Sequence, residues 1–164
     1  MKKGILIAAI LSALNFSQVL ACSIDGKSGF LPENNYRIAV DDKMAGDMTK
    51  EKFIALIDKV NAVYKPIVEK IAGKPFIINR RWDDDIVNAY AMQWENDWRV
   101  TMYGGLARHP LITDDALMSV LCHEIGHHIG GFPKALAGKH WAVNEGQADY
   151  FSTLKCMRKV LVND

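Results

Sequence analysis

The run HEIGHH, from His123 to His128, constrains this 164-residue chain more than any other feature. It contains an HExxH pattern within a stretch whose apolar residues have helical spacing. On a helix, His123 and His127 stand one turn apart with Cβ atoms about 5–6 Å from each other, so both rings can reach one cation. Glu124 lies beside the first ring, toward the open side of such a metal. This arrangement is typical of a hydrolytic zinc site.

The flanking sequence predicts where this helix begins and ends. Thr113 is a suitable N-cap, and Asp114 and Asp115 favour the first turn of a helix. Gly130 and Gly131 then stop it. An apolar stripe between these limits consists of Leu117, Val120, Leu121 and Ile125. The motif therefore lies on a helix of about four turns, next to a break where another element can approach. The alternative interpretation is a pair of buried structural histidines.

A hydrolytic zinc site needs three protein ligands, so a third ligand is expected from a separate element. Glu145 is the best candidate, since it begins a second helical run from about Ala142 to Val160. Asp149 follows four residues later on the same face. We expect Asp149 to accept the proton on the outer nitrogen of a ligand histidine, which fixes the orientation of that ring. The alternative for this pair is a solvated acidic face.

HEIGH followed by an ExxxD helix resembles the gluzincin zinc metallopeptidases. The segment WRVTMYGGLARHPLITDDALMSVLCHEIGHH is similar to the strand, loop and active-site helix of the HtpX and prenyl-protease type. The resemblance covers about Asn88 to Cys156. It implies one zinc ion per chain, bound by His123, His127 and Glu145. It also implies that Glu124 acts as the general base that activates the zinc-bound water for peptide-bond hydrolysis.

Asn88-Ala89-Tyr90 resembles the edge strand of that clan. In the family this edge pairs with an extended peptide backbone, which implies a polypeptide substrate here. Only residues 150–164 follow Asp149, so small single-domain gluzincins are the nearer comparison. The residue that stabilises the oxyanion is left unassigned, with Tyr150, His140 and Tyr103 as weak candidates.

The remaining sequence predicts an α+β, small zincin-like domain with a short, mostly antiparallel sheet. Thr49 caps a first helix that Pro66 is expected to kink or interrupt and that Gly73 ends. Its apolar residues at helical spacing are Phe53, Leu56, Ile57, Val60, Val63 and Tyr64. The expected strands are Phe76 to Arg80, Ile86 to Met92 and Trp98 to Tyr103, after a polar entry and a short candidate strand from Tyr36 to Val40. Glu95-Asn96-Asp97 is expected to form the hairpin turn that joins the last two strands.

The first 21 residues predict an export signal, and residues 22–164 a single domain. Lys2 and Lys3 precede an apolar run that is too short for a membrane span. Cleavage after Ala21 and lipidation of Cys22 both remain open. We therefore expect an exported protein, located in the periplasm, anchored by lipid in the envelope, or secreted.

Three cysteines in an exported chain leave one thiol unpaired unless it is modified. Cys122 and Cys156 are the natural pair, because Cys122 precedes His123 and Cys156 lies two turns beyond Asp149. A bridge between them would join the two ligand-bearing helices. Two buried free thiols are the alternative.

The formal net charge is +1, and lysines and arginines are spread along the chain. This distribution argues against nucleic acid as a partner. Asp83-Asp84-Asp85 lacks the oxygen spacing of a calcium loop and is interpreted as a solvated turn. The rival to an enzyme is a zinc-stabilised, non-catalytic envelope module that binds polypeptide or acts like a chaperone. The oligomeric state is not predicted.

Overall fold

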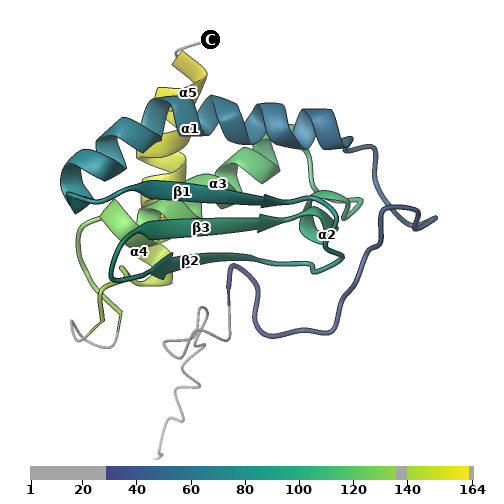
Figure 1. Cartoon of the computed structure of the whole chain (residues 1–164), viewed down its shortest axis with the longest axis horizontal. Helices are drawn as coiled ribbons and strands as arrows, with labels where there is room; N and C mark the ends of the chain where they lie inside the picture. Colours follow the sequence, from purple (N-terminus) through teal and green to yellow (C-terminus); the bar gives the residue numbers. More distant parts are fainter. Residues whose placement is uncertain (1–28, 136–139, 163–164) are drawn as a thin grey trace, which may run out of the picture.

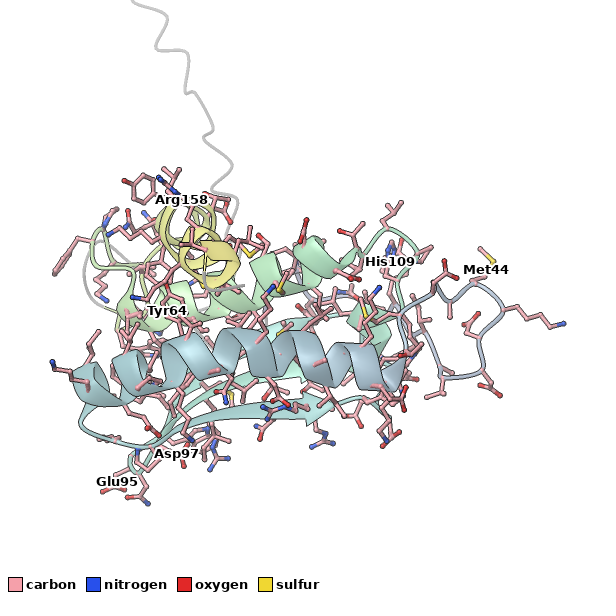
Figure 2. The ribbon with its side chains drawn as sticks, turned by 90° about the horizontal axis from the view of Figure 1, so that it is seen from above. Met44, Tyr64, Glu95, Asp97, His109 and Arg158 are labelled. Carbon is pink, nitrogen blue, oxygen red and sulfur yellow. A yellow bond between two sulfur atoms is a disulfide. The ribbon has the colours of Figure 1, made fainter. Side chains whose placement is uncertain are left out.

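The computed structural model describes residues 29–135 and 140–162. The predicted export signal and Cys22 lie outside the described residues. Within the described part, a three-stranded sheet carries α1 and α3 on one face, and the helices near the C-terminus pack behind them (Figures 1 and 2). This is the expected α+β class. None of the helices among the described residues is long and apolar enough to cross a membrane.

Helix α1, Lys50–Ala72, begins as the sequence predicts. The Thr49 side chain accepts a hydrogen bond from the Lys52 N–H at 3.2 Å, and Gly73 ends the helix in the left-handed conformation with φ 63°. Of the kink or interruption expected at Pro66, the interruption was wrong, because the helix continues through this residue. Pro66 removes one backbone donor, yet buried apolar residues on both sides of it hold the same face of α1 against the core.

The sheet consists of β1, Phe76–Arg81, β2, Ala89–Gln93, and β3, Trp98–Tyr103, in the order β1-β3-β2. β2 and β3 form the expected antiparallel hairpin, but β1 pairs with β3 in parallel. The sheet is therefore mixed rather than mostly antiparallel. β3, which carries the fully buried Val100 and Met102, lies at the centre, and β2 is an edge strand (Figure 1).

Short α2, Gly104–Ala107, leads from the sheet to α3, Asp114–Ile129, whose Thr113 cap and glycine stop are as expected. The predicted helix from Ala142 to Val160 begins later, at Glu145. It consists of α4, Glu145–Phe151, a π-helical stretch, Ser152–Met157, and α5, Arg158–Val162. Tyr64 of α1, labelled in Figure 2, packs edge-on against Phe151 at 5.8 Å between ring centroids.

The chain before α1 runs antiparallel to residues 85–89. The Phe30 N–H bonds to the Ala89 carbonyl and the Ile38 N–H to the Asp85 carbonyl, both at 2.9 Å. No continuous strand forms from Tyr36 to Val40, contrary to expectation; the segment makes only an isolated bridge between Arg37 and Ile86.

Arg108, which follows α2, anchors this N-terminal stretch at Ile38. Its side chain is 1% exposed. The guanidinium donates to the carbonyl oxygens of Ile38, Trp82 and Asp84 at 2.7–3.0 Å and lies over the Trp82 ring. Because these hydrogen bonds satisfy a buried cation, Arg108 ties the N-terminal stretch to the loop after β1.

Candidate metal centre and active site

Helix α3 places three of the predicted site residues together in the protein interior. His123, Glu124 and His127 are 4%, 0% and 3% exposed. Their candidate ligand atoms all lie within 4.8 Å of one another. The helix packs against α1, β2, β3 and α4, so the surrounding side chains hold the three groups without access to bulk solvent.

Helix α4 carries the fourth site residue, Glu145. Asn144 caps it by accepting a hydrogen bond from the Gln147 N–H at 2.9 Å, which sets Glu145 in its first turn. The close approach of the two helices depends on Gly126, inside the HExxH motif. A Cβ at this position would lie only 3.1 Å from the Cα of Ala148. A larger residue would therefore push α4, and Glu145 with it, away from the histidines.

Three potential ligands converge at this helix crossing. The Nε2 atoms of His123 and His127 lie 3.0 Å apart. One oxygen of Glu145 is 3.1 Å from His123 Nε2, and the other is 3.5 Å from His127 Nε2. The structure thus places the carboxylate of Glu145 beside both rings, as the sequence interpretation expects of a third ligand.

The outer nitrogens of both rings are held by acceptors. His123 Nδ1 lies 2.7 Å from Asp149 Oδ1, and His127 Nδ1 lies 3.0 Å from the Val143 carbonyl oxygen. Since a carbonyl can only accept, His127 Nδ1 carries the proton, and the Asp149 carboxylate favours the same tautomer at His123. Both neutral rings then direct a lone pair at the point that Glu145 also faces.

This donor set fits zinc. Tetrahedral zinc with bonds of about 2.0–2.1 Å holds neighbouring ligand atoms about 3.3 Å apart. The closest separations between the three side chains, 3.0, 3.1 and 3.5 Å, bracket that spacing. Two imidazole lone pairs and a carboxylate directed at one point repel each other unless a cation lies among them.

Glu124 is in a different situation from Glu145. Neither oxygen of its carboxylate has a hydrogen-bond partner among the described residues. Burial raises the pKa of Glu124 to about 7, against the lowering effect of His123 and the smaller effect of the nearby Ala91 backbone. A carboxylate with a pKa near neutrality, adjacent to the first histidine, is suited to accept and return a proton.

The two histidines are also electrostatically distinct. Burial acts to lower the pKa of His123, but the hydrogen bond to Glu145 and the charge on Glu124 outweigh it, and the pKa is raised. The pKa of His127 is lowered, first by burial and then by the charge on His123. The acidic groups therefore favour positive charge at His123, whereas His127 is held neutral.

His128, next in sequence, has a packing role that the sequence interpretation did not identify. Its ring is stacked between Trp98 at 5.2 Å and Trp141 at 5.1 Å, and its Nε2 lies 3.0 Å from the Arg99 carbonyl oxygen. Burial lowers the pKa of His128 to about 4. His128 is thus a neutral core residue that fixes the end of α3 against the sheet.

Cys122 and Cys156 form a disulfide with a Cα–Cα distance of 5.6 Å. It joins α3, directly before His123, to the π-helical stretch that follows α4. One turn away along α3, the Ser152 hydroxyl donates to the Ser119 carbonyl at 2.7 Å. Both links hold the helix that carries Glu145 and Asp149 in register with α3.

The Asn88-Ala89-Tyr90 segment lies at the start of edge strand β2. The Asn88 side chain bonds to both the N–H and the carbonyl of Leu31, at 2.9 and 3.0 Å. Phe30 packs edge-on against the His123 ring, with centroids 5.3 Å apart. The sequence interpretation treated this stretch as a polar entry, and only the apolar pair Phe30-Leu31 within it signals a buried contact.

The three weak candidates for oxyanion stabilisation lie in separate surroundings. Tyr103 packs against Tyr90, His140 packs against Trp141, and Tyr150 is 48% exposed. The oxyanion role stays unassigned.

Residues 50–132 match the sequence model of peptidase family M48, from the start of α1 to just beyond the HExxH helix. The chain belongs to peptidase family M48. Searches of the curated proteins and of the solved structures gave no match. Membership in M48 makes this chain a zinc metallopeptidase with an HExxH motif, of the HtpX and prenyl-protease type. Glu145 and Asp149 lie beyond the residues matched to M48, and their placement beside the two histidines comes from the structure.

Proposed function

We propose that this M48 chain is a single-zinc endopeptidase that works in the bacterial envelope or outside the cell. The observation that carries the proposal is the convergence of His123, His127 and Glu145 beside a buried, unpaired Glu124. Zinc bound by these three ligands supplies Lewis acidity toward the scissile carbonyl and lowers the pKa of water.

The side chains of the protein divide the remaining work. Glu124 accepts the proton of the attacking water at a carboxylate oxygen and returns it to the leaving amine. Asp149 and the Val143 carbonyl hold the outer nitrogens of the two histidines, so that both inner nitrogens stay directed at the metal. Because Glu124 is fully buried, its proton affinity is set by the protein rather than by bulk water.

The substrate is a polypeptide in extended conformation. The outer edge of β2 offers backbone groups for strand addition, and its Ala89 carbonyl already accepts a hydrogen bond from the Phe30 N–H. Asn88 can receive both the N–H and the carbonyl of one residue of such a strand, as it does with Leu31. Asn88, Ala89 and Tyr90 would thus align the peptide beside His123 and Glu124.

Export is part of the proposal and rests on the sequence of residues 1–21. It accords with the Cys122–Cys156 disulfide, since disulfides persist in oxidising compartments. The proposal has two forms. Either a lipid on Cys22 attaches the protein to a membrane, or cleavage after Ala21 releases it. Mass spectrometry of the protein recovered from cells distinguishes them.

The central test is Glu124→Gln in the zinc-loaded protein. We expect one zinc per chain in both proteins, and a fall in kcat of about 10²–10⁴-fold in the variant, measured with a quenched peptide library. Undiminished hydrolysis by Glu124→Gln would exclude Glu124 as the base. Zinc in both proteins, with peptide binding but cleavage in neither, would favour the non-catalytic binding module.

A further inference from the structure

Three residues of the chain itself lie along the outer edge of β2. We call residues 29–31 the edge segment. The Phe30 N–H donates to the Ala89 carbonyl at 2.9 Å, and Asn88 bonds to both backbone groups of Leu31. The edge segment therefore uses the same backbone partners that an extended polypeptide would need.

The edge segment also covers the catalytic groups. The Phe30 ring packs against His123, and His123, Glu124 and His127 are at most 4% exposed. A substrate carbonyl cannot approach groups that are this deeply buried while their cover stays in place. Entry of substrate thus requires local movement, and the edge segment lies directly at the entrance beside β2.

The fit of the edge segment is close enough to exclude a side chain at its first residue. A Cβ on Gly29 would lie 1.9 Å from the Ala89 carbonyl oxygen. Since the obstacle is backbone, it cannot turn away as a flexible side chain could. Gly29 therefore permits a backbone approach that any other residue would prevent.

The part of the N-terminal stretch that follows is held differently. Ile38 is buried, and its carbonyl accepts two hydrogen bonds from Arg108. Phe30 and Leu31 are only partly buried where they pack against the core, and the next two residues, Pro32 and Glu33, are exposed. The edge segment can therefore leave β2 while Ile38 stays anchored.

We propose that the edge segment is a built-in competitor for the substrate-binding edge of β2, so that a polypeptide substrate binds only by displacing residues 29–31. This inference rests on the proposed use of that edge for substrate. In the conformation seen in the structure, residues 29–31 cover the substrate-binding edge of β2. Activity is then limited by the fraction of molecules in which the edge is free.

Two substitutions in the zinc-loaded full chain test this. Gly29→Ala prevents the close backbone approach, and Phe30→Ala removes the ring from His123. Each is expected to raise kcat/KM for a quenched peptide library by about tenfold, the gain if nine-tenths of the molecules are covered. Tyr36→Ala, in the same stretch but 71% exposed, is the matched control and should change nothing. Thermal unfolding of each variant shows that it is folded.

A peptide supplied in trans provides a second test, made on the Gly29→Ala protein once thermal unfolding has shown that it is folded. The peptide of residues 29–35, GFLPENN, should inhibit Gly29→Ala competitively, and more strongly than GALPENN. Equal kcat/KM in all variants, lower kcat/KM in a folded Gly29→Ala, or no inhibition by the peptide would overturn the proposal. Cleavage within residues 29–31, detected by mass, would also overturn it, because the segment would then be a substrate.

A binding measurement separates this proposal from the proposed hydrolysis. Fluorescence anisotropy of a labelled extended peptide is measured on zinc-loaded Glu124→Gln with and without Gly29→Ala. Tighter binding in the double variant supports the competitor even if no form of the protein cleaves peptide. If the unmodified chain hydrolyses peptide but both variants bind the labelled peptide equally, the proposed peptidase function stands. The proposal that residues 29–31 compete with substrate is then wrong.

Discussion

The two helices that build the metal centre differ in how they hold their residues. Helix α3 is a regular helix of 16 residues, and its three site residues are at most 4% exposed. Helix α4 has seven residues and continues into a π-helical stretch. Its Glu145 and Asp149 side chains are 26% and 70% exposed. The site residues of α3 are fixed by burial, whereas those of α4 lie on its more exposed face, opposite the buried Ala148 and Phe151.

The difference shows that the position of Glu145 and Asp149 depends on links between α4 and α3, in addition to the buried side chains of Ala148 and Phe151. These links are the disulfide, the Ser152–Ser119 hydrogen bond, the close contact at Gly126 and the Val143 N–H bond to the His127 carbonyl at 3.1 Å. The zinc ligand from α4 is thus positioned from outside its own helix. Loss of a ligand should destroy the centre, while loss of a link between the helices or of the charge on Asp149 should only weaken it.

The largest effect is expected from His127→Ala on α3. It removes a ligand and leaves Glu145 and His123 with an incomplete donor set. Zinc content, measured by elemental analysis after dialysis, should fall close to zero, and peptide hydrolysis should fall to the level of a zinc-free sample. His109→Ala, in the segment between α2 and the start of α3 (Figure 2), is the control. Retention of a full zinc equivalent by His127→Ala would contradict the ligand assignment.

An intermediate effect is expected when the link between the helices is removed. The double variant Cys122→Ala/Cys156→Ala opens a loop closed across 34 residues, which should lower the free energy of unfolding by about 3–4 kcal/mol. Zinc affinity should fall as well, because Glu145 is no longer held in register. Denaturant unfolding and competition with a chelator measure the two quantities. Cys22→Ala is the matched control, and unchanged affinity in a destabilised double variant would show that the disulfide does not position Glu145.

The smallest effect is expected from Asp149→Asn on the exposed face of α4. The amide keeps the shape of the side chain but removes the charge that orients His123, so zinc affinity or kcat/KM should fall by about 10- to 100-fold. The exposed Asp41→Asn serves as a control for a change of net charge. A loss as complete as that of His127→Ala would mean that Asp149 does more than orient a ring.

Much of the fold followed from local patterns. The caps at Thr49 and Thr113, the stop at Gly73 and the hairpin of β2 with β3 are confirmed. These features depend on residues close in sequence. The spacing within HEIGH predicts adjacent rings for the same reason, and the structure brings their Nε2 atoms to 3.0 Å.

Features that depend on contacts between distant segments were not predicted. The parallel pairing of β1 with β3 joins two strands that are separated in the sequence by β2, so no local turn signal indicates it. The Val143 carbonyl that orients His127 is a backbone group and has no sequence signature. Pro66 shows the opposite error, since tertiary packing on both sides of it overrode a local rule.

Because Arg108 anchors Ile38, the edge segment stays close to β2 even after it has detached from that strand. Only six residues separate Leu31 from the clamped Ile38, so an edge segment that leaves β2 stays within a small volume around it. A ligand tethered by such a short linker acts at an effective concentration on the order of millimolar. Short peptides at low concentration would compete poorly with the edge segment for the edge of β2. Long unfolded chains, which present many overlapping segments, would compete far better. The tether would thus select substrates by their length.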